Sequence, residues 1–397
     1  MNYTADDLNA DVTTALFFNT VLLLLYLFLG LAGNAVVLYI YTCRMRRTEE
    51  RYFIPILAVA DILACLSGVT LGVVSNFHRA HYTLDTFCKV GYFLTWMTTT
   101  VSGIIILLIA LNRHLMICRP IGPQLTVARK RRAFIVIVIF SVVSSGPMLY
   151  FLGERSFPFV YKGQLINATL CTLRFSDGLL YKLQLSYFMI EIFLALLNMV
   201  ITCGLYIPVG VKIYKRFKQS SRRVNNSRRA KQDTTVQSDF TATSNNMGKI
   251  YIEESEFEES VFSTTVSTVR NSSNSISLCS KCKSNPNKDN KREERDTSIN
   301  RKKRVKRKQV RHNFTMMFAT IIIFYIMAYL PTLVLMMLPG NDPARFWFSR
   351  DPITFNILVF LQRAFLLNNI VNAFVYSYFD ISFRKEVKKI LCCFRCF

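Results

Sequence analysis

The feature that most constrains the fold of this chain is a series of seven long apolar runs separated by polar segments. Each run has about 20 residues or more, which is the length of an α-helix that crosses the hydrocarbon core of a bilayer. The sequence therefore predicts an all-α membrane protein with a seven-transmembrane helix bundle. The predicted spans are Phe17–Tyr41, Tyr52–Asn76, Thr86–Cys118, Ala133–Leu152, Leu183–Tyr214, Phe314–Leu338 and Ile353–Tyr378.

Basic residues near the span ends predict the orientation of the chain. The first, third and fifth loops and the C-terminal tail are rich in Lys and Arg, as at Arg44–Arg51 and Arg129–Arg132. Such loops stay in the cytoplasm, so we expect the N-terminus outside and the C-terminus inside, at the plasma membrane. Residues 1–16 contain three aspartates and no basic residue, so they are predicted to be an extracellular N-terminus rather than a signal peptide, with the first run as a signal anchor.

The net charge of +24 lies in loops between apolar runs, which indicates membrane orientation rather than nucleic-acid binding. Much of it is in a long third intracellular loop, residues 215–313, rich in Ser, Thr, Asn, Lys and Arg. Such a segment cannot bury a core, so the sequence predicts that it is largely disordered. Two interpretations stay open for it: a loop that docks partners and is phosphorylated, or a solvated tether.

The tail, residues 379–397, alternates apolar and basic residues at helical spacing. This pattern predicts a short amphipathic eighth helix on the inner membrane leaflet, with its basic face toward anionic lipids. Three cysteines follow, and they are either palmitoylation sites or inert thiols: Cys392, Cys393 and Cys396.

Asp61 is a carboxylate in the middle of the second span, where it must be protonated or recruit a cation. Polar side chains occur at matching depth in other spans, at Ser102, Asn368 and Asn372. Oxygen ligands suit a hard cation, so these four residues are a candidate sodium site. Apart from this ion, no cofactor is expected.

Glu191 lies in the outer half of the fifth span and has three open interpretations. It could meet a basic group of a ligand, pair with Arg363, or be neutral and hydrogen-bonded. At the end of the third span, Arg113 is either a positive-inside anchor or a functional residue.

Two cysteines, Cys88 and Cys171, are predicted on the outer, oxidising side, and their pairing is the simplest account. Alternating residues around Lys162-Gly163 predict a β-hairpin near Cys171. Asn2 and Asn167 lie in glycosylation sequons on the same side. No Walker, His-Glu-x-x-His or Gly-x-Ser-x-Gly motif is present, so we expect no enzyme activity.

Several of these residues recur in one order and spacing, and in that respect the chain resembles the rhodopsin-class (class A) G-protein-coupled receptors. Cys88 precedes Arg113 by 25 residues, the spacing that the family shows. The further matches are Gly33-Asn34, Leu57–Asp61, Tyr206, Pro331, Asn372 with Tyr376, and Phe379–Phe383.

The resemblance implies a role for each matched residue. Arg113 would face a heterotrimeric G protein in the active state, with Tyr206 and Tyr376 supporting it. The Asp61 cluster would bind a sodium ion that favours the inactive state, and Pro331 would be the pivot by which the sixth span opens. Arrestin and receptor kinases are further partners that the resemblance implies.

The chain departs from the family pattern at several positions. The acid expected before the arginine is Asn112, and His114 follows it; the expected proline after Asn372 is Ala373. Asparagine cannot form an ion pair with Arg113, so we expect raised basal signalling. Further departures are Tyr329 in the sixth span, where the family has tryptophan, and Asn198 in the fifth, where it has proline.

The resemblance also narrows the ligand. Amine receptors carry an aspartate at the position of Thr95, and photopigments carry a lysine at that of Leu366, so neither a monoamine receptor nor a photopigment is expected. The hairpin-forming outer loop and the short N-terminus suit a peptide receptor. The residues predicted to line its pocket are Tyr92, Thr95, Thr99, Tyr187, Glu191, Tyr329 and Gln362. The alternatives are a receptor-like scaffold with weak or no coupling and a seven-span transporter, although the sequence lacks the internal repeats of transporters.

Overall fold

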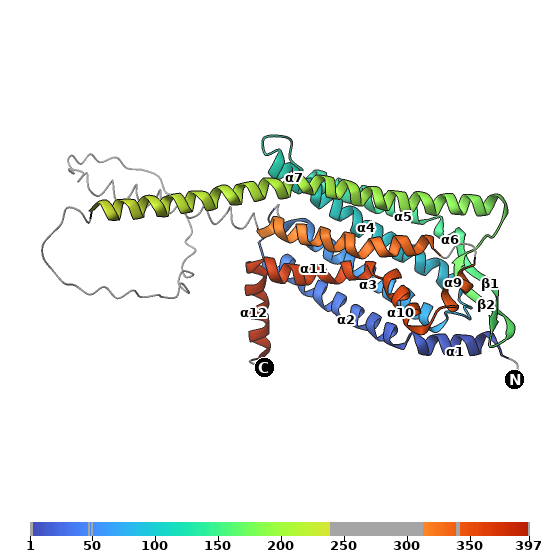
Figure 1. Ribbon diagram of the computed structural model, residues 1–397. Helices are drawn as coiled ribbons and strands as arrows, with labels where there is room; N and C mark the ends of the chain where they lie inside the picture. Colours follow the sequence, from blue (N-terminus) through green and yellow to red (C-terminus); the bar gives the residue numbers. More distant parts are fainter. Residues whose placement is uncertain (1–2, 47, 49–50, 239–312, 339–341, 396–397) are drawn as a thin grey trace, which may run out of the picture. The chain divides into compact units, whose positions relative to one another are not determined.

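The computed structural model describes residues 3–46, 48, 51–238, 313–338 and 342–395 (Figure 1). Contacts within the chain divide it into two units, Met1–Lys215 with Lys308–Phe397, and Arg216–Arg307. The first unit contains the spanning helices and every site described below.

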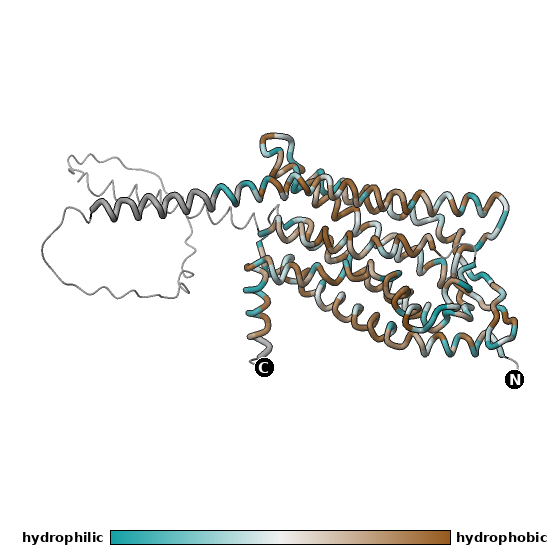
Figure 2. The backbone as a smooth tube through the Cα atoms, viewed as in Figure 1, coloured by the Kyte–Doolittle hydropathy of each residue, from teal (hydrophilic) through white to brown (hydrophobic). Residues whose placement is uncertain are grey.

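Six helices of the described chain are long and apolar enough to cross a membrane. They are α2 (Phe17–Tyr39) with the π-helical turn η1 (Ile40–Arg44), α3 (Phe53–Phe77), α4 (Asp85–Cys118), α5 (Val127–Ser145) with α6 (Met148–Phe151), α7 (Gly178–Ser238), and the helix Asn313–Met337. Figure 2 shows hydrophobic residues along the length of these helices. Large apolar side chains such as Phe18 and Val143 are exposed on them, as expected for surfaces that face lipid.

The spanning part of α7 ends at Lys215, but the helix continues to Ser238. It therefore enters the segment for which the sequence predicts disorder. Residues 239–312, the rest of the predicted third intracellular loop, lie outside the described residues.

The seventh predicted span, Ile353–Tyr378, corresponds to two helices separated by a bend. Helices α10 (Pro352–Gln362) and α11 (Phe365–Phe379) meet at a bend of 61°. At the bend the amides of Arg363 and Ala364 donate to carbonyls three residues back instead of four, so the helix tightens into a turn. The carbonyl of Leu361 also accepts a hydrogen bond from the Thr332 hydroxyl, at 3.3 Å.

Three further helices lie outside the spans. Helix α1 (Ala5–Ala15) begins with a capping box, in which the Thr4 hydroxyl accepts from the Asp7 amide and the Asp7 carboxylate accepts from the Thr4 amide. Helix α9 (Pro343–Phe348) precedes the seventh span. Helix α12 (Ile381–Arg395) follows it and corresponds to the predicted amphipathic eighth helix.

The predicted hairpin is present as strands β1 (Leu152–Tyr161) and β2 (Gln164–Leu173), paired antiparallel with Tyr161 opposite Gln164. The two turn residues, Lys162 and Gly163, both have positive φ, at 47° and 82°. A two-residue turn of this kind matches the twist of the strands that it joins. A disulfide between Cys88 and Cys171 ties β2 to the outer end of α4, as the sequence predicted.

Buried apolar residues form two main clusters. The larger lies inside the bundle and includes Ile54, Ile106 and Phe318. The second lies where α1, the hairpin, α9 and α10 meet, and includes Leu8, Phe157 and Trp347. We call this second cluster, together with the four elements that form it, the outer cap.

Candidate functional site

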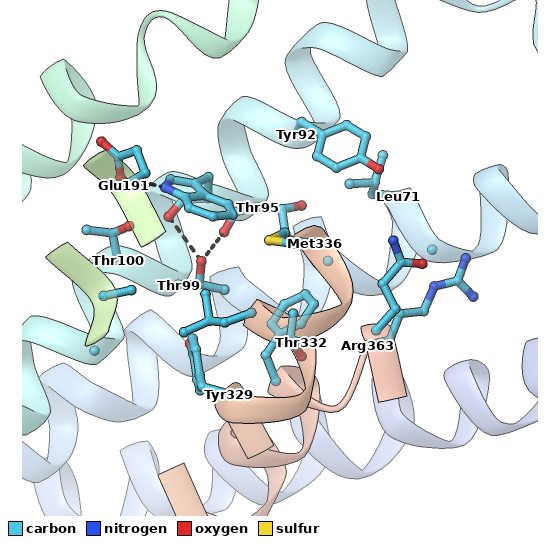
Figure 3. A pocket seen from close by; sticks show the side chains of 18 of the residues that line it. Leu71, Tyr92, Thr95, Thr99, Thr100, Glu191, Tyr329, Thr332, Met336 and Arg363 are labelled. Carbon is cyan, nitrogen blue, oxygen red and sulfur yellow. Dashed lines mark hydrogen bonds between the residues drawn. The ribbon is translucent and has the colours of Figure 1, made fainter. Parts of the chain in front are cut away.

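An inner cavity of about 160 Å³ lies between α3, α4, α7, the helix Asn313–Met337 and the α10–α11 bend. In Figure 3, Glu191 lies on one side of it and Arg363 on the other, with Thr95, Thr99 and Met336 between them. Apolar and aromatic side chains supply most of its wall. Six of the seven predicted pocket residues line it: Tyr92, Thr95, Thr99, Glu191, Tyr329 and Gln362.

Tyr187 is the predicted pocket residue that does not line the inner cavity. Its hydroxyl donates to the carbonyl of Ser144 at 2.8 Å, and its ring lies 5.6 Å from that of Phe151. Tyr187 therefore joins α7 to the fourth span. Its prediction as a lining residue was wrong because a phenol on a helix can satisfy its hydroxyl on a neighbouring backbone as well as in a pocket.

Glu191 accepts a hydrogen bond from the indole Nε1 of Trp96, at 2.9 Å, and is 8% exposed. The structure therefore shows the hydrogen-bonded alternative for this carboxyl group and not a pair with Arg363. Trp96 also lines the cavity and was missed in the sequence analysis. Its place next to Thr95 and one helical turn after Tyr92 is the signal that could have identified it.

A polar contact between three spans lies deeper in the bundle. The side-chain amide of Asn198 donates to the Tyr325 hydroxyl at 2.8 Å and to the Gly103 carbonyl at 3.3 Å. A methyl group at Gly103 would come within 3.2 Å of the Tyr325 oxygen, so the glycine leaves the room for this contact. Tyr325 in turn packs against the ring of Tyr329 in the cavity, at 4.7 Å.

The predicted sodium residues gather around Asp61, which is fully buried. One carboxylate oxygen accepts from the Ser102 hydroxyl at 3.0 Å, and the other accepts from the Asn372 amide at 2.6 Å. The Asn368 amide donates to the Oδ1 of Asn369, at 3.5 Å.

The chemistry of this cluster fits a hard cation. Within the part of the chain that the structure describes, Asn368 Oδ1 and Asn372 Oδ1 are buried without a hydrogen-bond partner. Buried oxygens normally have a partner, and a sodium ion would supply one for both. Asp61, Ser102, Asn368 and Asn372 are therefore the residues that could hold the ion.

Arg113 lies near the C-terminal end of α4 and is 2% exposed. Its guanidinium lies 4.7 Å from the centre of the Phe318 ring and 5.8 Å from that of Phe314, both on the helix Asn313–Met337. The neighbouring Asn112 donates to the sulfur of Met116, at 3.6 Å. On the other side, the Nδ1 of His114 lies 3.0 Å from the Leu205 carbonyl.

The two tyrosines expected to support Arg113 lie on either side of this region. The Tyr206 hydroxyl donates to the carbonyl of Thr315 at 2.6 Å, which joins α7 to the helix Asn313–Met337. Tyr376 is fully buried on α11, with its ring 5.9 Å from that of Tyr41. Pro331 lies farther along the helix Asn313–Met337, between the cavity residues Tyr329 and Thr332.

Some of the predicted modification sites lie in the described part of the chain and others lie outside it. Asn167 is exposed on β2, and Cys392 is exposed near the end of α12. Cys393 also belongs to α12. Asn2 and Cys396 lie outside the described residues.

Comparison with known proteins gives one family match that covers most of the chain. The sequence model of the family described as "7 transmembrane receptor (rhodopsin family)" matches residues 33–376. Among similar proteins, the tachykinin-like peptides receptor 99D of Drosophila melanogaster is 26% identical over 198 residues, which is 46% of this chain and 35% of the relative. The mesotocin receptor of Rhinella marina is 31% identical over 145 residues, 36% of either chain.

A third relative, the prostaglandin D2 receptor 2 of Rattus norvegicus, is 30% identical over 135 residues, 33% of this chain and 32% of the relative. The chain thus spans about a third of the length of these relatives.

Proposed function

Because the family match extends over residues 33–376, the chain belongs to the rhodopsin family of seven-transmembrane receptors, and we propose that it activates a heterotrimeric G protein at the plasma membrane. In this proposal an extracellular ligand enters the inner cavity and the cytoplasmic end around Arg113 receives the G protein. The basic loops on that side support a cytoplasmic location for it.

The observation that carries the proposal is that α4 contributes a residue to the ligand cavity and also carries Arg113. Thr95 lines the cavity, and Arg113 lies 18 residues later on the same helix. At 1.5 Å per residue the two positions are about 27 Å apart, most of the hydrocarbon thickness. The helix Asn313–Met337 likewise carries Tyr329 at the cavity and Phe318 against Arg113. A ligand between these helices can therefore bias their packing at the cytoplasmic end.

We propose that activation moves the cytoplasmic end of the helix Asn313–Met337 outward, with Pro331 as the pivot. The movement would remove Phe314 and Phe318 from Arg113 and separate the Thr315 carbonyl from the Tyr206 hydroxyl. Arg113 would then contact the G protein, with Tyr206 and Tyr376 free to support it. Arrestin and receptor kinases would act on the same exposed end.

In this proposal the Asp61 cluster stabilises the inactive state. A sodium ion held by Asp61, Ser102, Asn368 and Asn372 would join α3, α4 and α11 in the inactive arrangement. Asp61→Asn removes the charge, so we expect sodium to lose its effect on basal signalling. Sodium dependence that survives in this variant would contradict the site.

The ligand is proposed to be a peptide, since two similar proteins are named as receptors for tachykinin-like peptides and mesotocin. Glu191, on the cavity wall, would meet a basic group of that ligand in exchange for Trp96. Unchanged potency of the identified ligand on Glu191→Gln would show that this contact is absent.

The test is a G-protein dissociation assay in cells that express the full chain, run against a peptide library. Arg113→Gln should lower the maximal response by about tenfold or more, because a charge-assisted hydrogen bond to the partner contributes about 1.5–3 kcal/mol. Arg119→Gln, at an exposed residue just beyond α4, is the matched control. An Arg113→Gln variant that signals like the wild type at equal surface expression would refute coupling through this residue.

Asn112 offers a second variant at the same place. Its amide contacts Met116, and an aspartate there would instead favour an ion pair with Arg113 in the inactive state. Asn112→Asp should therefore reduce basal signalling. Absence of basal signalling in the wild type, or an unchanged level in this variant, would count against the idea.

A further inference from the structure

We propose that the ligand carries a carboxylate and that Arg79 and Arg363 bind it at the wall of the inner cavity opposite Glu191. This inference rests on the proposed function, since it requires that the cavity binds a ligand. It adds the chemical class of the group that is recognised.

Arg363 is a cation held almost completely inside the bundle. It is 8% exposed and donates through Nη1 to the Oδ1 of Asn19, at 2.7 Å, which is a neutral partner. Its guanidinium lies against Gly72, where an added methyl group would be 3.5 Å from Nε. The glycine and the α10–α11 bend together make room for a charged group at this depth.

Arg79 is the second cation of the same wall. Its guanidinium lies 4.7 Å from the centre of the Trp347 ring and 6.0 Å from that of Phe355. Burial lowers the pKa of Arg79 to about 10, so it remains charged at neutral pH. Within the described residues its buried Nε has no hydrogen-bond partner.

Neither guanidinium forms an ion pair with a carboxylate of the described chain. The acid of the inner cavity, Glu191, lies across from Arg363 in Figure 3 and accepts from Trp96. Arg363 is buried and Arg79 is half-buried near it, and two such cations are unfavourable together unless an anion compensates them. A carboxylate is the group whose planar oxygens match a guanidinium in geometry and charge.

The position of Arg79, and of Gln362 next to Arg363, also suits the path of a ligand. An outer cavity of about 330 Å³ lies beneath β2 and is bordered by Cys171 and Trp347. Arg79, Tyr92 and Gln362 line both this cavity and the inner one. An acidic group would therefore be held at the junction of the two cavities, while the rest of the ligand extends toward Glu191.

The carboxylate could belong to a peptide, as a free C-terminus or an acidic side chain, or to a small carboxylic acid. Both sources are tested with matched pairs. One arm uses short peptides with a C-terminal carboxylate and the same peptides as C-terminal amides. The other uses alkanoic and arylalkanoic acids and their primary amides. The readout is the unfolding temperature of the purified full-length receptor, which rises when a ligand binds the folded state.

At least one acid should stabilise the receptor at a concentration about ten- to a hundred-fold below that of its amide, as expected for a lost charge-assisted hydrogen bond. Arg79→Gln and Arg363→Gln should each remove most of this advantage. Arg350→Gln, at an exposed arginine that does not line either cavity, should keep it.

Equal effects of acid and amide in every pair, including no effect of either, would overturn the proposal. So would an advantage that persists in both glutamine variants. Arg363→Lys retains the charge without the planar guanidinium and should keep part of the advantage, and the unfolding temperature of each variant without ligand controls for misfolding. Because the assay contains no G protein, acid recognition can succeed while G-protein coupling fails, and the two failures are distinguishable.

Discussion

The two ends of the bundle are held in different ways. At the outer end, α1, the hairpin, α9 and α10 surround an apolar cluster of their own, and the Cys88–Cys171 disulfide ties the hairpin to α4. At the opposite end of the bundle, Arg113 lies against the rings of Phe314 and Phe318 on a neighbouring helix.

The contacts of the outer cap join segments that are far apart in the sequence. Asn9 on α1 donates to the Phe77 carbonyl and accepts from the Ala80 amide, and Asn356 on α10 donates to the Ala15 carbonyl. Breaking one such contact leaves the others in place. At the end that holds Arg113, both Arg113 and Tyr206 contact the helix Asn313–Met337, so one movement of that helix releases both contacts together. The comparison indicates a firmly held end at the outer cap and a more easily released end around Arg113.

The strongest test of this comparison removes a central side chain of the outer cap. Trp347 is 4% exposed, and the guanidinium of Arg79 packs over its ring. Trp347→Ala should destabilise the receptor by about 3–5 kcal/mol, as large-to-small changes in a core do. Phe18→Ala, at a ring that is 81% exposed, is the control, and the unfolding temperature is the measurement. Equal shifts in the two variants would mean that the outer cap contributes little.

A smaller loss of stability is expected from the hydrogen bond between Asn198 and Tyr325, which lies between the two ends of the bundle. Tyr325→Phe removes the hydroxyl that accepts from Asn198 and leaves a buried amide with one partner fewer. The expected loss is about 1–3 kcal/mol, together with raised basal signalling because α7 and the helix Asn313–Met337 are less firmly joined. Tyr378→Phe, on an exposed ring, is the control. Stability and basal signalling that both match the wild type would exclude a role for this contact.

The capping box of α1 provides a weaker perturbation of the outer cap. Thr4→Ala removes the hydroxyl that accepts from the Asp7 amide and should cost about 1 kcal/mol in local stability. Faster hydrogen exchange along α1, with unchanged exchange at Arg113, is the expected result. Thr14→Ala on the same helix is the control, since its exposed hydroxyl donates to the Ala10 carbonyl within the helix. Unchanged exchange in Thr4→Ala would show that packing alone holds α1.

The smallest change in stability is expected from the titration of Asp11 with pH. Tyr161 and then Lys162 donate hydrogen bonds to Asp11 and lower its pKa below the usual 3.8. Because the folded pKa is the lower one, this stability is present above about pH 4 and is lost as pH falls through the folded pKa. The groups are exposed, so solvent screens the interaction and its contribution is small.

Asp11→Asn should therefore unfold at a lower temperature than the wild type at pH 7, and the difference should shrink as the pH falls below about 4. A difference that stays constant across this range would contradict an ionic contribution of Asp11.

The sequence by itself determined the features that depend on local pattern and on solvent. Apolar length predicted the spans, because hydrocarbon excludes polar side chains, and Lys162-Gly163 predicted the hairpin turn, because few residues accept positive φ. The polar residues at the depth of Asp61 could also be found, since such groups in a membrane need one another.

Only the tertiary structure decided which of several available partners each polar group takes. Glu191 accepts a hydrogen bond from Trp96 and does not pair with Arg363. Tyr187 donates to the Ser144 carbonyl and does not line the inner cavity. The break at Arg363 depends likewise on hydrogen bonds to α2 and to the helix Asn313–Met337. Which partner each side chain takes depends on the distances between helices. The spacing of residues in the sequence does not determine these distances, because any face of a spanning helix can be turned toward lipid or toward a neighbour.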